Sequence, residues 1–392
     1  MVEDDLLNEM IAWRQCLHAH PETAFEEVST ARLVVSVLSR LGFDVHEGIG
    51  TTGVVGTLHR GAGPRIGLRA DMDALPLEES NTFGHRSCNA GKMHACGHDG
   101  HTAMLLGAAA LLSHDQDWRG SVHLIFQPAE EAAGGGRVMI EEGLFDRFPC
   151  DAVFGLHNWP GLPLGHFAIN HGPMMASFDT FEIQVEGSGS HAAMPEEGTD
   201  SLVCASHIVV ALQTIVSRRL SPKESSVVSV TQIHGGDAWN VLPARALIRG
   251  TVRCFSASVQ ARIRTLLCEI SEATAQAHGA KASVAFHYGY PAMVNATLEA
   301  DIALSAARAT VGESRVSLGC KPSMASEDFA FMAKARPAAY IWMGVDREHP
   351  SVPLHNPHYD FNDEALAIGA AYWVNVVKAF GATRAGAIGD IC

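Results

Sequence analysis

Two kinds of hydrophobic pattern divide the chain. In its first part, short apolar runs alternate with segments in which apolar residues recur at helical spacing. Apolar runs of this length are typical of strands buried on both faces of a sheet. The pattern predicts helices over 5–18, 29–41 and 101–114, and strands over 53–58, 65–69, 122–126 and 153–156. Such alternation predicts an open α/β sheet, in which ligands bind beyond the carboxyl ends of the strands.

The pattern changes at Phe178. Residues 201–219 and 256–277 carry apolar positions at helical spacing, and the remaining apolar segments predict strands over 178–186, 226–233, 244–253 and 282–288. The order β-α-β-β-α-β is that of a ferredoxin-like domain. A strand over 338–343 and a helix over 363–380 then restore the α/β character. We therefore expect a two-domain α/β protein: residues 1–177 and 291–392 form the catalytic domain, and 178–290 form an inserted ferredoxin-like domain.

Charge narrows the classes of partner. The 392 residues include 43 acidic and 28 basic side chains, giving a net charge of −15. This charge repels phosphate backbones and anionic membranes, so neither nucleic acid nor membrane is an expected partner. The most apolar stretch, 102–112, is shorter than the ~20 residues of a membrane span. An acidic N-terminus and nine scattered cysteines without a CxxC pair favour a cytoplasmic protein with reduced thiols.

The chain contains 21 histidines, enough to make a metal site worth seeking. The segment 93–101, MHACGHDGH, precedes a predicted helix and places Cys96 two residues before His98. In an extended segment, side chains two residues apart point the same way. A thiolate with an imidazole suits zinc or another late divalent metal.

Three further elements offer ligands near predicted strand ends or on loops. Glu130 and Glu131 follow the strand 122–126, His157 ends the strand 153–156, and His355 lies on a late loop. Two acidic residues could equally begin the next helix as favourable first-turn acids, and a lone histidine is usually structural. Their convergence on one edge of an α/β sheet favours a two-metal site, which can activate water and polarise a carbonyl. Glu130, beside a ligand, suits the general base.

The motifs together resemble the aminoacylase/carboxypeptidase family of metallohydrolases. They are RADMDALP at 69–76, the cluster at 94–101, QPAEE at 127–131, GSGSHAAMP at 187–195 and SEDF at 326–329. The resemblance runs from Leu17 to His358, and the subgroup it indicates contains hippurate hydrolases, N-acyl-amino-acid amidohydrolases and auxin-conjugate hydrolases.

The resemblance implies a role for each matching residue. The metal-ligand positions of the subgroup fall on Cys96, His98, Glu131, His157 and His355. Glu130 falls on the general-base position, and His191 on a histidine of the inserted domain that contacts the substrate carbonyl. Asn240 and Arg253 match substrate-contacting positions, although an arginine ending a strand is more usually a solvated charge. The family further implies that the inserted domain acts as a lid or in dimerisation.

The sequence thus predicts a metal-dependent amidohydrolase that cleaves N-acyl amino acids, hippurate-like or N-acetylated. Two divalent ions per chain (Zn²⁺, Mn²⁺, Co²⁺ or Ni²⁺) and a homodimer or homotetramer are expected. A dipeptidase or carboxypeptidase would use the same site with a different pocket, and a non-catalytic metal-binding protein is a further alternative. An NAD-dependent oxidoreductase is disfavoured, because GIGTTG at 48–53 precedes a strand rather than a helix. No GxSxG motif supports a serine hydrolase.

Overall fold

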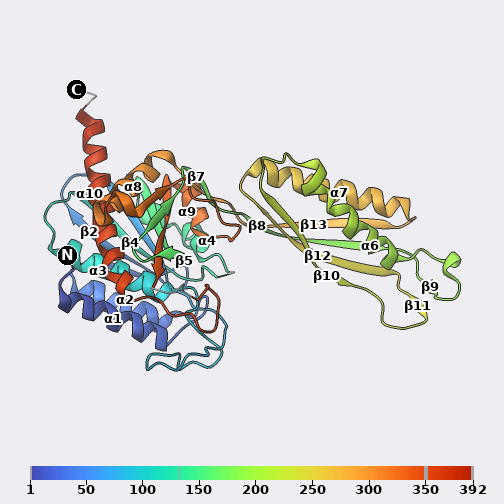
Figure 1. Ribbon diagram of the computed structural model, residues 1–392, viewed down its shortest axis with the longest axis horizontal. Helices are drawn as coiled ribbons and strands as arrows, with labels where there is room; N and C mark the ends of the chain where they lie inside the picture. The colour runs from blue at the N-terminus through green and yellow to red at the C-terminus, as the bar shows by residue number, and fades with distance from the viewer. Residues whose placement is uncertain (1, 132, 348–351, 390–392) are drawn as a thin grey trace. The chain divides into compact units, whose positions relative to one another are not determined.

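The computed structural model describes residues 2–131, 133–347 and 352–389, and the chain divides into two compact units (Figure 1). The first unit comprises Met1–Met174, Val294–Lys321 and Asp328–Cys392, and the second comprises Met175–Met293 and Pro322–Glu327. Helices and strands alternate in both units, so the protein has a mixed α/β fold, as the sequence predicted.

An eight-stranded sheet forms the centre of the first unit, in the order β1-β2-β4-β3-β5-β16-β6-β15. Its inner strands β4, β3, β5 and β16 are mutually parallel, so their carboxyl ends lie at one edge. The bounds are β1 Asp44–Ile49, β2 Gly53–Arg60, β3 Arg65–Asp71, β4 Gly120–Gln127, β5 Ala152–Pro163, β6 Phe167–Ile169, β15 Val316–Leu318 and β16 Ala338–Asp346. A separate pair joins β7 (Gly172–Met175) to β14 (Met293–Asn295).

Alternation along the inner strands gives the two faces of this sheet different roles. On β3, Ile66, Leu68 and Ala70 enter the large core, whereas Arg69 and Asp71 alternate with them. Asp71 is paired in register with Gln127 on β4, so a row of polar side chains occupies the second face near the carboxyl edge. All these residues are buried. The sheet therefore carries a buried polar layer where an α/β protein binds its ligands.

Helices of the first unit pack around this sheet. The long helices α3, α8 and α10 supply much of the large core, and α4 and α9 contact the inner strands as well. The bounds are α1 Asp4–Ala19, α2 Val28–Arg40, α3 His98–His114, α4 Gly135–Glu141, α5 Leu144–Arg147, α8 Thr297–Val311, α9 Phe329–Ala335 and α10 Glu364–Gly389, with a 3₁₀ turn at Glu313–Arg315.

The C-terminal helix α10 is more apolar than the sequence analysis recognised. Its segment Glu364–Arg384 is long and apolar enough to cross a membrane by length and composition alone. Half of its most apolar window is buried, however, and Tyr372, Trp373 and Phe380 lie in the core of the first unit. Packing within the protein accounts for its apolar character.

The second unit is a four-stranded antiparallel sheet with the strand order β10-β12-β8-β13. Alternate residues of β8 and β12 form one core with the helices α6 and α7, which pack against each other on one face of the sheet (Figure 1). The main bounds are β8 Phe178–Glu186, α6 Ser201–Leu212, β10 Ser226–His234, β12 Arg245–Cys254, α7 Ala257–Ala277 and β13 Lys281–Tyr290. The short elements are β9 Ser190–His191, β11 Val241–Leu242, a 3₁₀ turn at Pro195–Glu197 and a π-helical turn at Ile215–Arg219.

Three local predictions were wrong. Helix α3 begins at His98 instead of 101, so His98 lies in its first turn. The helix predicted over 201–219 is not one continuous α-helix, because α6 ends at Leu212 and a π-helical turn then covers Ile215–Arg219. His157 does not end its strand, because β5 continues to Pro163 and pairs His157 with Trp342. The eight cysteines within the described residues are all free, and Cys392 lies outside those residues.

Candidate metal centre and active site

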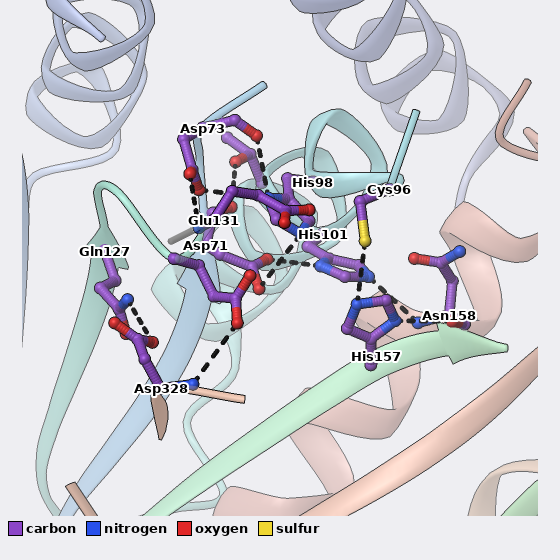
Figure 2. A network of polar contacts seen from close by, with 12 residues as sticks. Asp71, Asp73, Cys96, His98, His101, Gln127, Glu131, His157, Asn158 and Asp328 are labelled. Atoms are coloured by element: carbon purple, nitrogen blue, oxygen red, sulfur yellow. Dashed lines mark hydrogen bonds and ion pairs between the residues drawn. The ribbon is translucent and has the colours of Figure 1, made fainter. Parts of the chain in front are cut away.

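The loop before α3 brings Cys96 and His98 together by a route that the sequence analysis did not foresee. The segment is not extended, because Gly97 takes a left-handed conformation with φ = 91° and caps the helix. A Cβ at Gly97 would also lie 2.5 Å from Asn158 Oδ1, so only glycine fits this position. The left-handed turn directs both Cys96 and His98 toward the carboxyl edge of the sheet (Figure 2).

Backbone carbonyl oxygens orient His98 and His157, the two buried histidines of the predicted ligand set. His98 Nδ1 lies 2.9 Å from the Asp73 carbonyl oxygen, and His157 Nδ1 lies 2.6 Å from the Asn158 carbonyl oxygen. A carbonyl oxygen only accepts, so each Nδ1 carries a proton and each Nε2 of the neutral ring keeps a lone pair. His157 Nε2 lies 3.5 Å from Cys96 Sγ (Figure 2).

Glu131 and His355 meet beside this group. Glu131 lies between β4 and α4, and its backbone N–H donates to Asp73 Oδ2 at 2.9 Å. His355 has a left-handed backbone with φ = 62°, and its N–H donates to the Ala95 carbonyl. The Nε2 atom of His355 lies 3.1 Å from Glu131 Oε1. A left-handed non-glycine residue is typical of functional sites, where surrounding contacts hold the strain.

All five predicted ligands therefore come together, in two groups that share the thiol. Cys96, His98 and His157 offer atoms within 4.8 Å of one another, and so do Cys96, Glu131 and His355. His98 Nε2 is buried, has no hydrogen-bond partner among the described residues and lies 3.6 Å from Asp71 Oδ2. A sulfur, three imidazoles and a carboxylate suit late divalent metals, and the unpartnered nitrogen fits a metal ligand.

Electrostatics at the site favour a bound cation. Burial raises the pKa of the Cys96 thiol, whereas hydrogen bonds to Cys96 and Glu131 raise the pKa of His355 to about 10. Burial, and then the neighbouring His101, lower the pKa of His157 well below its usual range. Burial alone would lower the pKa of His98, but the neighbouring Asp71 and then Cys96 raise that pKa well above its usual range. The site thus draws positive charge to a place where the imidazole of His157 stays neutral. A metal ion meets both requirements, because it binds a thiolate, a carboxylate and neutral imidazoles together.

Glu130 lies next to Glu131 but has different surroundings. Its side chain is 7% exposed, and its Oε1 accepts a hydrogen bond of 3.4 Å from the backbone N–H of Asp328. Helix α4 begins only at Gly135, so neither glutamate is a first-turn acid. Glu130 and Glu131 come from one turn in which Ala129 has φ = 55°, and this strained backbone sets their directions apart.

Sequence reasoning assigned no role to several residues that orient the ligands. Asp73 contacts the His98 ring and the Glu131 backbone, whereas Asp71 accepts from His101 Nδ1 (Figure 2). His101 Nε2 in turn accepts the Asn158 N–H at 3.0 Å, directly after His157. Such outer partners fix ligand orientation in metal sites. The motifs at 69–76 and 94–101 contained them, but only the fold shows which ligand each one contacts.

The second unit carries the other three predicted residues. His191 and Asn240 are exposed: His191 ends β9, and Asn240 lies in the turn directly before β11, whose Val241 is opposite His191. The Ala193 N–H donates to His191 Nδ1 at 3.1 Å, so the neutral ring carries its proton on Nε2. Arg253 lies on β12, 4.3 Å above the Phe178 ring, and donates to Ser326 Oγ at 3.1 Å.

The model of the peptidase family M20/M25/M40 matches residues 67–379, which is most of the chain. The chain belongs to this family. The expected family of metallohydrolases is thereby confirmed.

Relatives within the M20/M25/M40 family cover nearly the whole chain. The chain is 40% identical to a hippurate hydrolase of Campylobacter jejuni over 95% of this chain and 96% of that protein. It is 42% identical to an N-acyl-L-amino acid amidohydrolase of Geobacillus stearothermophilus over 74% of this chain and 79% of that protein. The solved YXEP protein of Bacillus subtilis, described as a dinuclear metal-binding peptidase of family M20, has a TM-score of 0.87, 32% identity and coverage of 97% and 100%.

Proposed function

We propose that the protein is a metal-dependent amidohydrolase that hydrolyses N-acyl amino acids, hippurate-like or N-acetylated, to a carboxylic acid and an amino acid. The observation that carries this proposal is the pair of ligand groups sharing Cys96, with the buried carboxylate of Glu130 beside them. The names of the hippurate hydrolase and the N-acyl-L-amino acid amidohydrolase support the same substrate class.

The proposed cofactor is a pair of divalent ions, drawn from Zn²⁺, Mn²⁺, Co²⁺ and Ni²⁺. His98 and His157 would hold one ion, Glu131 and His355 the other, and the Cys96 thiolate would be shared. The dinuclear Bacillus relative and the two ligand groups support this arrangement. When bound, such a pair polarises a carbonyl oxygen and makes a bound water more acidic.

Glu130 is the proposed general base. Its carboxylate adjoins the ligands without belonging to either group that shares Cys96, and it is fixed by the Asp328 N–H. In the reaction Glu130 takes a proton from the water as it attacks the acyl carbonyl. It then gives the proton to the leaving nitrogen, which departs as the free amine of the amino acid.

His191 is the proposed oxyanion donor. The tautomer supported by the Ala193 contact leaves an N–H at Nε2, on an exposed ring. An N–H donor stabilises the negative charge that develops on the carbonyl oxygen during attack.

Arg253, with Asn240, is the proposed site for the substrate carboxylate. Burial lowers the pKa of Arg253, an effect that the charge of Asp179 opposes, and no residue in the described ranges forms a direct ion pair with its guanidinium. A half-buried guanidinium that forms no direct ion pair within the described ranges fits a substrate carboxylate, which its planar fork can bind through two hydrogen bonds. This would explain selection of an amino acid over other amides.

We further propose that residues 178–290 form a ferredoxin-like domain that serves as a lid or in dimerisation, between catalytic parts 1–177 and 291–392. The βαββαβ order and the sheet order support the ferredoxin-like assignment. The edge strand β10 and the exposed Val203 and Val210 of α6 support a homodimer or homotetramer. The free cysteines support a cytoplasmic location.

One substrate panel tests the proposed function. The purified protein would be stripped of metal and loaded separately with Zn²⁺, Mn²⁺, Co²⁺ or Ni²⁺. Each form would be assayed with benzoyl-glycine, N-acetyl amino acids and glycyl dipeptides. Hydrolysis of the N-acyl amino acids is expected with at least one metal. Preference for the dipeptides would identify a dipeptidase, and no turnover with any form would indicate a metal-binding protein without this activity.

A further inference from the structure

A second buried network of hydrogen bonds lies beside the proposed metal ligands, and none of those ligands belongs to it. Its centre is the Asp328 carboxylate, which is fully buried. Asp328 Oδ1 accepts from Gln127 Nε2 at 2.7 Å and from Arg69 Nη2 at 3.1 Å, and Oδ2 accepts from the Gly136 N–H at 2.8 Å. Figure 2 shows Gln127 and Asp328 in contact, on the side of the site away from Cys96 and His157.

Arg69 ties this network to the ligand side of the site. Its Nε donates to Gln127 Oε1 and its Nη1 to Asp71 Oδ2, both at 2.8 Å, and Asp71 accepts from His101. The guanidinium also lies 5.7 Å from the centre of the Phe329 ring. A buried guanidinium that serves two carboxylates and an amide fixes all three, because each displacement would strand a desolvated charge.

The backbone N–H of Asp328 connects this hydrogen-bonded network to the Glu130 side chain. The Asp328 N–H donates to Glu130 Oε1 at 3.4 Å, so an amide whose own side chain is held by three donors orients the carboxylate. A general base gains from such fixation, since a misplacement of ~1 Å can cost about 100-fold in rate.

We propose that Asp328 is a positioning residue for Glu130: the Arg69–Gln127–Gly136 cradle holds Asp328 so that its N–H orients the carboxylate for proton transfer. This inference rests on the proposed function for the role of Glu130. The rival explanation is that Asp328 only anchors the chain where it re-enters the first unit after Glu327.

Two variants separate these explanations. Asp328→Asn keeps the shape and the backbone N–H but removes the charge that pairs with Arg69. Gly136→Ala removes no group, but its Cβ would lie 3.0 Å from Gln127 Oε1, 3.2 Å from Asp328 Oδ2 and 3.3 Å from the Asp328 carbonyl oxygen, so the hydrogen-bonded pair of Gln127 and Asp328 must move to accommodate it. Alanine also favours helix α4 over glycine, so any loss of activity is not explained by a weaker helix. Gly381→Ala on α10 is the matched control, because nothing lies within 4 Å of its Cβ.

The expected results concern kcat rather than substrate binding. Asp328→Asn should lower kcat by about 10- to 100-fold and Gly136→Ala by roughly 3- to 10-fold, with KM within about 2-fold and metal content unchanged. Gly381→Ala should match the wild type. In a Glu130→Gln background, Asp328→Asn should have little further effect, because the group it positions no longer takes a proton.

Crystal structures of both variants supply a readout independent of activity. They should show the Glu130 carboxylate displaced from the Asp328 N–H. If Glu130 stays in place and kcat is unchanged, or if the loss persists in the Glu130→Gln background, the proposal is overturned. A failure of Asp328→Asn to fold leaves Gly136→Ala to decide by the same criteria. If the wild type hydrolyses no N-acyl amino acid, the proposed function fails, and the crystal structures still decide whether Asp328 holds Glu130.

Discussion

The proposed metal ligands of the first unit and the segments of the second unit around His191 and Asn240 differ in burial and in how their side chains are held. Cys96, His98 and His157 are at most 6% exposed, and each histidine ring is oriented by a backbone carbonyl. His191 is exposed on a two-residue strand, and Asn240 is exposed in the turn before the strand that pairs with it. Water activation needs atoms fixed by a rigid frame, whereas substrate contacts can be made by residues that become buried only on binding. Each difference predicts a different response to mutation.

Removal of metal should have the largest effect. Dialysis against a chelator should abolish activity, and a divalent metal should restore it, because the proposed reaction needs the ions that the two ligand groups of the first unit would hold. Full activity in a preparation shown by elemental analysis to be metal-free would exclude a metalloenzyme.

Single cysteine variants sharpen this prediction. Cys96→Ala should lower the metal bound per chain, since the thiol belongs to both ligand groups. Cys204→Ala is the matched control, because Cys204 is equally buried but lies in the core of the second unit. Wild-type metal content in Cys96→Ala would remove Cys96 from the ligand set.

The adjacent glutamates should show the next largest effect, and a clean division of roles. Glu130→Gln keeps the size and the acceptor for the Asp328 N–H but cannot take a proton, so kcat should fall by about 10²- to 10⁴-fold with metal content unchanged. Glu131→Gln should instead weaken metal binding, which titration with metal would measure. The reverse pattern would show that the two roles are exchanged.

The sequence predicted much of this site because its residues lie in short motifs. Glu130, Glu131 and the pair Cys96 and His98 each lie within a few residues of one another. The spatial arrangement of these residues was harder to predict from the sequence. The extended segment expected around Cys96 is a left-handed turn at Gly97, and nothing in a polar-hydrophobic pattern distinguishes the two.

Long-range partners were beyond the reach of the sequence for a different reason. Asp328 contacts Arg69 across 259 positions, and no local pattern encodes which distant carboxylate a buried arginine meets. The strands β2 to β5 were predictable because each contains a short run of buried, mainly apolar residues. The edge strand β1 was missed because its residues are mostly exposed or half-buried, which leaves no strong apolar run.

His191 should show a smaller but still large effect, despite its exposure. His191→Ala should lower kcat and kcat/KM by similar factors, because an oxyanion contact strengthens only as charge develops. Loss of one such donor costs ~3–4 kcal/mol, or roughly 10²- to 10³-fold. His287→Ala on β13 is the control, since His287 is 59% exposed in the same unit. A higher KM with intact kcat would show that His191 only binds substrate.

Arg253 should show the smallest of these effects, and one that depends on the substrate. A charge-assisted contact is worth about 1.5–3 kcal/mol, or about 10- to 150-fold in kcat/KM. Capping the substrate carboxylate as a primary amide should cost the wild type about that factor. In Arg253→Met the same cap should cost little, because the partner of the carboxylate is already gone.

The control for Arg253 lies on the same strand. Arg249 on β12 is already paired with Glu182 at 2.8 Å, so Arg249→Met should keep the full amide penalty of the wild type. The measurement is kcat/KM for the acid and the amide on all three proteins. Arg253 has no such pair in the part of the chain that the structure describes, and this difference between two arginines four residues apart is what the experiment examines. An equal amide penalty in Arg253→Met and the wild type would assign recognition of the carboxylate to another residue or to the metal ions.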